Sequence, residues 1–295
     1  MSKAIQRQAF AGLEHSCEGP DRILPARDMP GMERIEACFH GNAFTPHRHD
    51  TYAIGLTLDG VQSFAYRGAR RFSLPGNIIV LHPDELHDGG AATEAGLRYR
   101  MLYLDPALIR RGLDSDAAML PFLAEPVFAD PDLAALLHAA LDPLDQTLEE
   151  LFVDDLLVRL ASGLSRQAGR PLQSLRVPAA RAAILARDFL AQHAARPVRS
   201  QELEAVTGLD RFELSRHFRA MFSTSPHRFL TMRRLERARA MIVAGEPLAE
   251  AAAASGFADQ SHLTRQFKRA YGMTPGRWAA MVQAGFAQGR RERPA

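Results

Sequence analysis

The sequence predicts a multidomain α+β protein, with an N-terminal antiparallel β-barrel and dimerisation helices followed by an all-α domain that contains two helix-turn-helix units. Three observations predict this class. The 295 residues are about twice the usual length of one domain. Near Pro131 the apolar spacing changes from that of strands to that of helices. A pattern in the last third of the chain occurs twice. We expect two domains, each with its own core.

Residues 31–104 are predicted to form short strands separated by tight turns. Apolar residues alternate with small or polar ones from Tyr52 to Leu58, and Asp59-Gly60 then supplies a turn. Further apolar-rich runs occupy residues 61–66, 70–74, 78–81 and 97–104. Short runs at this spacing are typical of a small antiparallel barrel or sandwich.

Two helices are predicted next, because apolar residues recur at helical spacing in residues 133–141 and 148–160, with a break near Pro143. The apolar stripe of the second helix either covers the barrel or pairs with a second subunit. We expect a mixture of both, and therefore a homodimer. Residues 167–178 lack periodicity and are predicted to be a linker, which divides the chain into domains over residues 1–166 and 179–295.

The net charge of +2 conceals an asymmetry between the halves. Residues 1–177 carry a net charge of −7, and residues 178–295 carry +9. A basic second half indicates a polyanionic partner, because Lys and Arg gain free energy by displacing counterions from phosphates. A basic surface that is merely solvated is the alternative that charge alone leaves open.

The basic half contains an internal repeat with an offset of 49 residues: LSRHFRAMFSTSPHRF, from Leu214 to Phe229, matches LTRQFKRAYGMTPGRW, from Leu263 to Trp278. Each copy predicts a short helix, a turn with Gly208 or Gly256, and a second helix with one apolar face, which together form a helix-turn-helix. A helix predicted over residues 227–243 connects the copies. Its length of about 25 Å suits two recognition helices in successive major grooves, about 34 Å apart.

The other face of the second helix in each copy carries side chains that suit DNA. Arg216 and Arg265 recur at the same helix position. This recurrence favours two hydrogen bonds from each guanidinium to guanine O6 and N7 over the alternatives, a solvated charge or an intrachain ion pair. Phe212 suits a thymine methyl group or, equally, a partly buried helix start. The predicted DNA-binding residues are Phe212, Ser215, Arg216, Arg219, Gln260, Ser261, Thr264, Arg265 and Lys268.

Histidines dominate the polar residues of the predicted barrel. His47 and His49 are predicted to alternate on one strand and to point to the same side. With Tyr52, His82 and His87 they form the predicted ligand-binding residues of an organic pocket, although His82 and His87 flank a turn and alternatively bond backbone carbonyls. No cofactor is expected, and His47, His49 and His87 are the alternative as metal ligands.

Residues 179–282 closely resemble the DNA-binding domain of the AraC/XylS family of transcription regulators. The resemblance is carried by Gly256-Phe257-Ala258, Ser261, Phe267-Lys268 and the run from Gly272 to Trp278. It implies seven helices, with bases contacted from the helices that contain Arg216 and Arg265. Residues 46–50 (PHRHD) and 83–87 (PDELH) look like the cupin effector-binding domain common in that family, over roughly residues 31–104.

The two resemblances imply a sequence-specific transcription regulator, not an enzyme, that binds double-stranded promoter or operator DNA and responds to a small-molecule effector. RNA polymerase is a further partner if the protein is an activator. Two alternatives stay open: a cupin-type metal-dependent enzyme with a fused DNA-binding domain, and a ligand-independent regulator whose barrel only dimerises. Ala53 stands at the glutamate position of the cupin metal pattern, which argues against the enzyme.

The sequence also predicts a cytoplasmic location without membrane contact. Its apolar runs are far shorter than the roughly 18 to 20 residues that span a bilayer. The first residues, MSKAIQRQAF, lack the continuous apolar stretch of a secretory signal. Cys17 and Cys38 are too few for a disulfide framework or for the cysteine set of an alkyl-transfer repair protein.

Overall fold

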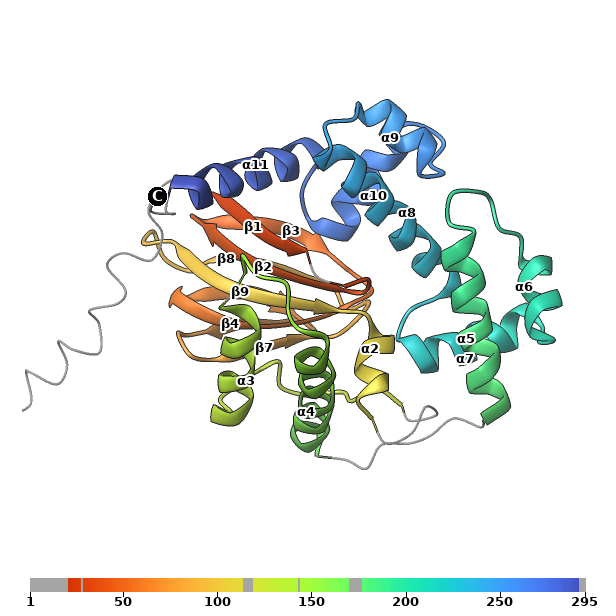
Figure 1. The fold of residues 1–295 in the computed structure, drawn as a ribbon, viewed down its shortest axis with the longest axis horizontal. Helices are drawn as coiled ribbons and strands as arrows, with labels where there is room; N and C mark the ends of the chain where they lie inside the picture. The colour runs from red at the N-terminus through yellow and green to blue at the C-terminus, as the bar shows by residue number, and fades with distance from the viewer. Residues whose placement is uncertain (1–20, 28, 114–118, 143, 170–176, 292–295) are drawn as a thin grey trace, which may run out of the picture.

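A computed structural model describes residues 21–27, 29–113, 119–142, 144–169 and 177–291 (Figure 1). Two antiparallel sheets form its N-terminal half. The larger has the order β1-β2-β9-β4-β7-β10, with β1 (Arg22–Arg27), β2 (Met32–Phe39), β4 (Tyr52–Gly60), β7 (Ile78–Leu81), β9 (Leu97–Leu104) and β10 (Val127–Phe128). The smaller has the order β3-β8-β5-β6, with β3 (Asn42–His47), β5 (Gln62–Tyr66), β6 (Ala69–Ser73) and β8 (His87–Ala91).

The predicted strand runs are therefore confirmed, within one or two residues at their ends. Strand β1 precedes the predicted region and was missed, because Pro25 interrupts its apolar pattern. It pairs with β2 along its whole length, so that it forms an edge of the larger sheet.

Helices α2 (Pro106–Arg111), α3 (Pro131–Leu141) and α4 (Glu150–Ala168) cover one face of the larger sheet. Both helices predicted from apolar spacing are present, on either side of Pro143, which lies outside the described residues. Asp130 begins α3 by accepting a hydrogen bond from the Leu133 N–H, with Pro131 at the first helical position. The apolar stripes pack on the outward side chains of β4 and β9, such as Ile54 and Leu102.

Residues 177–291 contain the seven helices that the family resemblance implies. They are α5 (Val177–Gln192), α6 (Ser200–Thr207), α7 (Arg211–Phe222), α8 (Pro226–Val243), α9 (Leu248–Ala254), α10 (Gln260–Tyr271) and α11 (Pro275–Arg291). In Figure 1, α10 and α11 lie above the strands, on the side opposite α3 and α4. Of the predicted linker, residues 170–176 lie outside the described part of the chain.

The cores of the two halves are not separate, which corrects the expectation of one core for each domain. The first helix-turn-helix unit buries its own cluster, which includes Leu214, Phe218 and Phe222. The apolar residues of the second unit, such as Phe267 and Trp278, belong instead to a cluster that continues into the barrel, through residues such as Phe39 and Tyr99. The barrel and the second unit therefore share one core.

Among the helices that the structure describes, none is long and apolar enough to span a membrane.

Candidate functional site

The first helix-turn-helix unit consists of α6 and α7. Gly208 ends α6 in the left-handed conformation, with φ of 71°, which glycine adopts without a steric penalty. Asp210 then begins α7, because its carboxylate accepts hydrogen bonds from the N–H groups of Phe212 and Glu213. The predicted apolar face of α7 is buried, as expected: Leu214, Phe218, Met221 and Phe222.

The second unit, α9 and α10, repeats this construction. Asp259, which is 49 residues after Asp210, begins α10 by accepting a hydrogen bond from the His262 N–H. Leu263, Phe267 and Ala270 are buried. Helix α8 joins the units, as predicted, and begins with Pro226 at a first-turn position.

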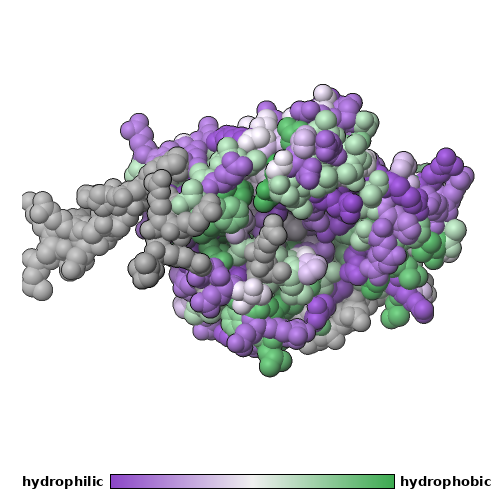
Figure 2. All heavy atoms as spheres, turned by 45° about the horizontal axis from the view of Figure 1, so that its top comes forward, coloured by the Kyte–Doolittle hydropathy of each residue, from purple (hydrophilic) through white to green (hydrophobic). Residues whose placement is uncertain are grey.

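The predicted DNA-binding side chains lie on the outward faces of α7 and α10. Arg216 and Arg265 are exposed and form no ion pair or hydrogen bond with the residues that the structure describes. Phe212 is 66 % exposed, so it is not a partly buried helix start. Ser215 and Thr264 are half-buried, and Arg219, Gln260, Ser261 and Lys268 are exposed. Hydrophilic residues prevail on the right-hand end of the molecule in Figure 2, where α5, α6 and α7 lie in Figure 1.

The second unit is bonded directly to the end of strand β3. The N–H and the hydroxyl of Thr45 donate to the Gly272 carbonyl oxygen at 3.0 and 2.8 Å, and the Arg48 N–H donates to the Arg269 carbonyl oxygen at 3.1 Å. Gly272 ends α10 in the left-handed conformation, with φ of 67°. A β-carbon at this position would lie 2.7 Å from the Thr45 carbonyl oxygen and 2.8 Å from the His47 Nδ1. Glycine therefore permits both the helix end and the close approach.

A cavity of about 510 Å³ lies between the barrel and the helices of the DNA-binding half. This volume is in the range of small-molecule sites. Strands β1 to β3 and the segment after β3 form one wall, and α8, α10 and α11 form the other. Its apolar lining includes Ile23, Ile35, Phe44, Tyr103, Met232, Val243, Tyr271, Trp278 and Phe286.

Charged residues from both walls meet at this cavity. Asp50 of the barrel side is buried and forms an ion pair with Arg233 of α8 at 2.8 Å. Arg233 also lies 3.7 Å from Asp105, and Arg239 pairs with Glu33 at 2.5 Å. Burial raises the pKa of the Asp50 carboxyl, although Arg233 opposes this effect. The Asp50 Oδ1 has no hydrogen-bond partner among the described residues.

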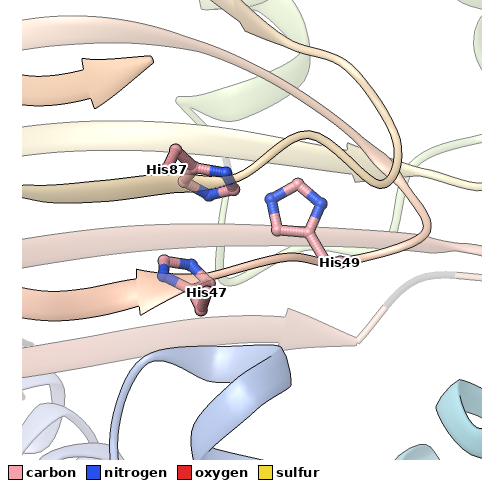
Figure 3. Close-up of side chains that lie close together, drawn as sticks. All are labelled: His47, His49 and His87. Carbon is pink, nitrogen blue, oxygen red and sulfur yellow. The ribbon is translucent and has the colours of Figure 1, made fainter. Parts of the chain in front are cut away.

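Three of the predicted ligand-binding residues form a compact cluster at the edge of the cavity (Figure 3). His47, at the end of β3, His49, just beyond it, and His87, at the start of β8, are buried, and each places a ring nitrogen within 4.8 Å of the other two. Burial lowers the pKa of His47 to about 3 and that of His87 to about 4, and it lowers the pKa of His49 well below its usual value. All three rings are therefore neutral at neutral pH.

With this geometry, two family matches cover most of the chain. Residues 29–161 match the family model of the AraC-like ligand binding domain, and residues 203–281 match that of a helix-turn-helix domain. The chain belongs to the AraC family of transcription regulators. Members of this family are DNA-binding regulators and not enzymes, so the sequence-based assignment is confirmed and the enzyme alternative is not supported.

Relatives and solved structures agree with this membership. The HTH-type transcriptional regulator YbfI of Bacillus subtilis is 26% identical over 229 residues, which cover 75% of this chain and 81% of the relative. The crystal structure of ToxT from Vibrio cholerae has the same fold, with a TM-score of 0.62 and 11% identity over 86% of this chain and 99% of ToxT. ToxT solved with a bound unsaturated fatty acid gives a TM-score of 0.64 at 12% identity over 88% of this chain and 98% of ToxT.

The five predicted ligand residues of this AraC-family chain separate into two groups. His47 and His49 line the cavity, and His87 joins them in the cluster. Tyr52 and His82 lie elsewhere, against the segment that precedes β10: the Tyr52 hydroxyl donates to the Pro121 carbonyl oxygen, and the His82 Nε2 accepts from the Leu123 N–H. The sequence predicted that His47 and His49 alternate within one strand. This prediction is wrong, because β3 ends at His47 and His49 lies beyond it.

Sequence reasoning missed the half of the cavity that the helices supply. Arg233, Glu236, Ala240 and Val243 follow helical spacing on α8 and line the cavity. These four residues form a second stripe beside the buried face of α8, and this stripe was the only indication in the sequence that α8 lines a cavity. Its mixture of charged and small residues also fits a solvated surface, so the stripe alone did not indicate contact with the barrel.

Proposed function

We propose that this protein is a sequence-specific transcription regulator in which a small molecule, bound in the cavity, alters how the second helix-turn-helix unit sits on the barrel. The cavity carries this proposal, because its walls come from the barrel and from three helices of the DNA-binding half. A ligand that contacts both walls has a different affinity for the docked and undocked arrangements. Such differential affinity is what couples ligand binding to DNA binding.

For DNA, we propose that α7 and α10 enter successive segments of the major groove on one face of the duplex. The nine side chains predicted for DNA contact are outward on these helices, and Arg216 and Arg265 occupy equivalent positions 49 residues apart. An arginine that is not engaged by the protein has its fork available for guanine O6 and N7. The more basic second half supplies the attraction to phosphates.

The charges of the lining indicate a class of effector. Four carboxyl groups (Glu33, Asp50, Asp105 and Glu236) line the cavity, against two guanidinium groups (Arg233 and Arg239). The excess of acceptors favours an apolar molecule with a cationic or strongly donating end. ToxT has been solved with an unsaturated fatty acid; for this chain the carboxylate excess disfavours an acid.

The remaining parts of the proposal follow the domain organisation. The segments 1–166, 167–178 and 179–295 serve as the ligand-binding and dimerisation domain, the linker and the DNA-binding domain. We propose a cytoplasmic homodimer whose contact includes α4, where Leu151 and Val158, two turns apart on one face, are 83 % and 51 % exposed respectively. RNA polymerase is a partner if the protein activates transcription.

Selection of genomic fragments tests the DNA proposal. Wild type, Arg216→Ala and Arg265→Ala are compared at one fixed salt concentration, because phosphate contacts make affinity depend on salt. We expect a site with two boxes about one helical turn apart, and each variant to relax a different box. Arg216→Lys and Arg265→Lys are matched controls, since lysine keeps the charge but not the fork. Equal, sequence-independent weakening in all four variants would reject base reading.

A thermal-shift comparison tests the effector class. Pairs of small amines and carboxylates with the same aromatic or alkyl body are added to wild type and to Asp50→Asn. We expect the amines to raise the melting temperature of wild type more than their acids, and this preference to decrease in Asp50→Asn, because that variant removes one buried carboxylate. A preference for the acids would contradict the proposed class, while the DNA experiment would be unaffected.

A further inference from the structure

The three clustered histidines share a hydrogen-bonding arrangement that goes beyond burial. The Nδ1 of His47 lies 2.9 Å from the Thr45 carbonyl oxygen, that of His49 lies 2.9 Å from the Thr51 carbonyl oxygen, and that of His87 lies 3.0 Å from the Glu85 carbonyl oxygen. A carbonyl oxygen only accepts, so each Nδ1 carries the proton and donates. In a neutral imidazole the Nε2 then has an available lone pair.

Within the described part of the chain, no group donates a hydrogen bond to the Nε2 of His47, His49 or His87. The hydrogen bonds of these rings are made by their Nδ1 atoms. The rings face one another in Figure 3, with centroids 4.2 Å apart for His47 and His87 and 4.8 Å apart for His49 and His87. The three rings thus bring acceptor nitrogens close to one another, where one cation or donor can satisfy them together.

His82 shows that a buried histidine of this barrel does not necessarily have a ring nitrogen without a hydrogen-bond partner. Its ring is as buried as the others, with 3 % of the residue exposed. Its Nε2 accepts from the Leu123 N–H at 3.0 Å, and its Nδ1 lies 2.9 Å from the Tyr66 hydroxyl. Both nitrogens of His82 are therefore engaged, whereas each clustered histidine has one engaged and one available.

A divalent transition metal matches this donor set. Ligating histidines commonly donate their other ring N–H to a backbone carbonyl, which fixes the tautomer and the ring orientation. Three neutral imidazoles suit zinc and leave a fourth position, and two of the three, His47 and His49, line the cavity. Zinc–nitrogen bonds of about 2.1 Å place ligand nitrogens about 3.4 Å apart. Small ring rotations from the present separations of up to 4.8 Å are then required.

The cluster is also connected to the second helix-turn-helix unit. His47 donates to the carbonyl of Thr45, whose N–H and hydroxyl donate to Gly272, at the end of α10. Arg48, between two of the histidines, donates to Arg269 of α10. The segment from Thr45 to His49 thus carries two of the three histidines and all three of these bonds to the unit.

We propose that His47, His49 and His87 bind one divalent transition-metal ion, zinc in the first place, and that the ion stabilises the docking of the second helix-turn-helix unit on strand β3. The ion fixes the segment from Thr45 to His49 to His87 on the neighbouring strand β8. A fixed segment presents its donors to Gly272 and Arg269 in one arrangement and so lowers the entropy cost of docking. Metal binding does not depend on the proposed effector or on DNA reading.

Metal analysis tests the site. The full chain is prepared without a histidine tag, stripped with a chelator, dialysed against zinc chloride and measured for bound zinc; cobalt(II) spectra report the ligand geometry. We expect one zinc per chain, and affinity lower by at least about 100-fold in His47→Gln, His49→Gln and His87→Gln. His82→Gln is the control for a buried histidine and His138→Gln for an exposed one, and both keep the zinc. Melting curves verify that each variant is folded.

Amide hydrogen exchange tests the docking. Zinc is expected to slow exchange at least about 5-fold in residues 44–48 and 269–274 of wild type and to leave the folded His87→Gln variant unchanged. Absence of stoichiometric zinc, or binding by the three variants as tight as that of the controls, overturns the metal site. Stoichiometric zinc without slower exchange overturns the role in docking. Neither result affects the selection of DNA sites by Arg216 and Arg265, which fails or succeeds on its own.

Discussion

The two helix-turn-helix units have the same construction but different attachments. The first has its own apolar cluster, whereas the cluster of the second continues into the barrel. The position after the recognition helix shows the consequence, because Ser223 and Gly272 are 49 residues apart and both adopt the left-handed conformation. Gly272 has barrel backbone against it, at Thr45. The two copies thus share their construction but differ in their contacts with the barrel.

The largest effect on stability is expected from substitutions in the two apolar clusters, and it distinguishes one cluster from the other. Phe218 and Phe267 are equivalent positions, and both are fully buried. Phe218→Ala and Phe267→Ala each remove an aromatic ring and are expected to lower the free energy of unfolding by about 3–5 kcal/mol. Hydrogen exchange mapped along the chain distinguishes them: the first variant loosens α5 to α8 only, whereas the second also loosens β2 and β9. Equal patterns in the two variants would mean that the cores are not different.

A smaller effect tests the contact at Gly272. Gly272→Ala places a β-carbon 2.7 Å from the Thr45 carbonyl oxygen, whereas Gly208→Ala meets nothing within 4 Å, at a similar positive φ. Both variants carry the left-handed penalty of about 1 kcal/mol, and Gly272→Ala adds about 1–3 kcal/mol of overpacking or loses the docking. Chemical denaturation of both variants gives the difference. If they are destabilised equally, the second unit does not depend on close contact with the barrel.

The sequence predicted the construction of the units because that construction is local. Caps, turns and apolar faces depend on residues within one or two turns of helix, and the repeat displayed each of them twice, as Asp210 and Asp259 illustrate. The strands were predicted for the same reason, since alternation within one strand indicates which face is buried. Strands β1 and β10 lie outside the predicted region and were missed; Pro25 breaks the pattern of β1, and β10 has only two residues.

The docked arrangement of the two halves was not predictable in the same way. Contacts such as that of Thr45 with Gly272, or of Asp50 with Arg233, join residues about two hundred positions apart, and no local pattern records them. The histidines illustrate what the sequence could predict and what it could not. Their residue types and spacing indicated a polar site, but only the fold separates His82, whose nitrogens are satisfied, from His47 and His87.

The arginines that follow the two recognition helices also differ in their contacts with the N-terminal half. Arg228 and Arg277 are 49 residues apart, and each reaches the N-terminal half. Arg228 pairs with Asp84 at 2.6 Å and donates to the Arg48 carbonyl oxygen, with both side chains of the pair 23% exposed. Arg277 lies 3.5 Å from Asp21 and is 45% exposed.

Arg228→Ala is therefore expected to cost about 1.5–3 kcal/mol, and Arg277→Ala no more than about 1 kcal/mol, because solvent and salt screen the second pair. Denaturation at low and high salt tests this, with salt decreasing the Arg277 effect more strongly. A larger effect from Arg277 would show that the peripheral pair holds the halves together.

The smallest effects are expected where the units are alike. Asp210→Ala and Asp259→Ala each remove the cap of a recognition helix and are expected to lower the melting temperature by about 2 °C. Hydrogen bonds from the N–H groups of Glu213 and Phe212 lower the pKa of Asp210 below its ordinary value of 3.8. Its stabilising contribution is therefore complete above that value and is lost as the pH falls through the lower, folded-state pKa. Melting curves of Asp210→Ala should thus approach those of wild type only in strong acid. Because a cap acts within its own helix, unequal effects of the two variants at neutral pH would indicate that docking on the barrel changes the recognition helix itself, and not only its attachment.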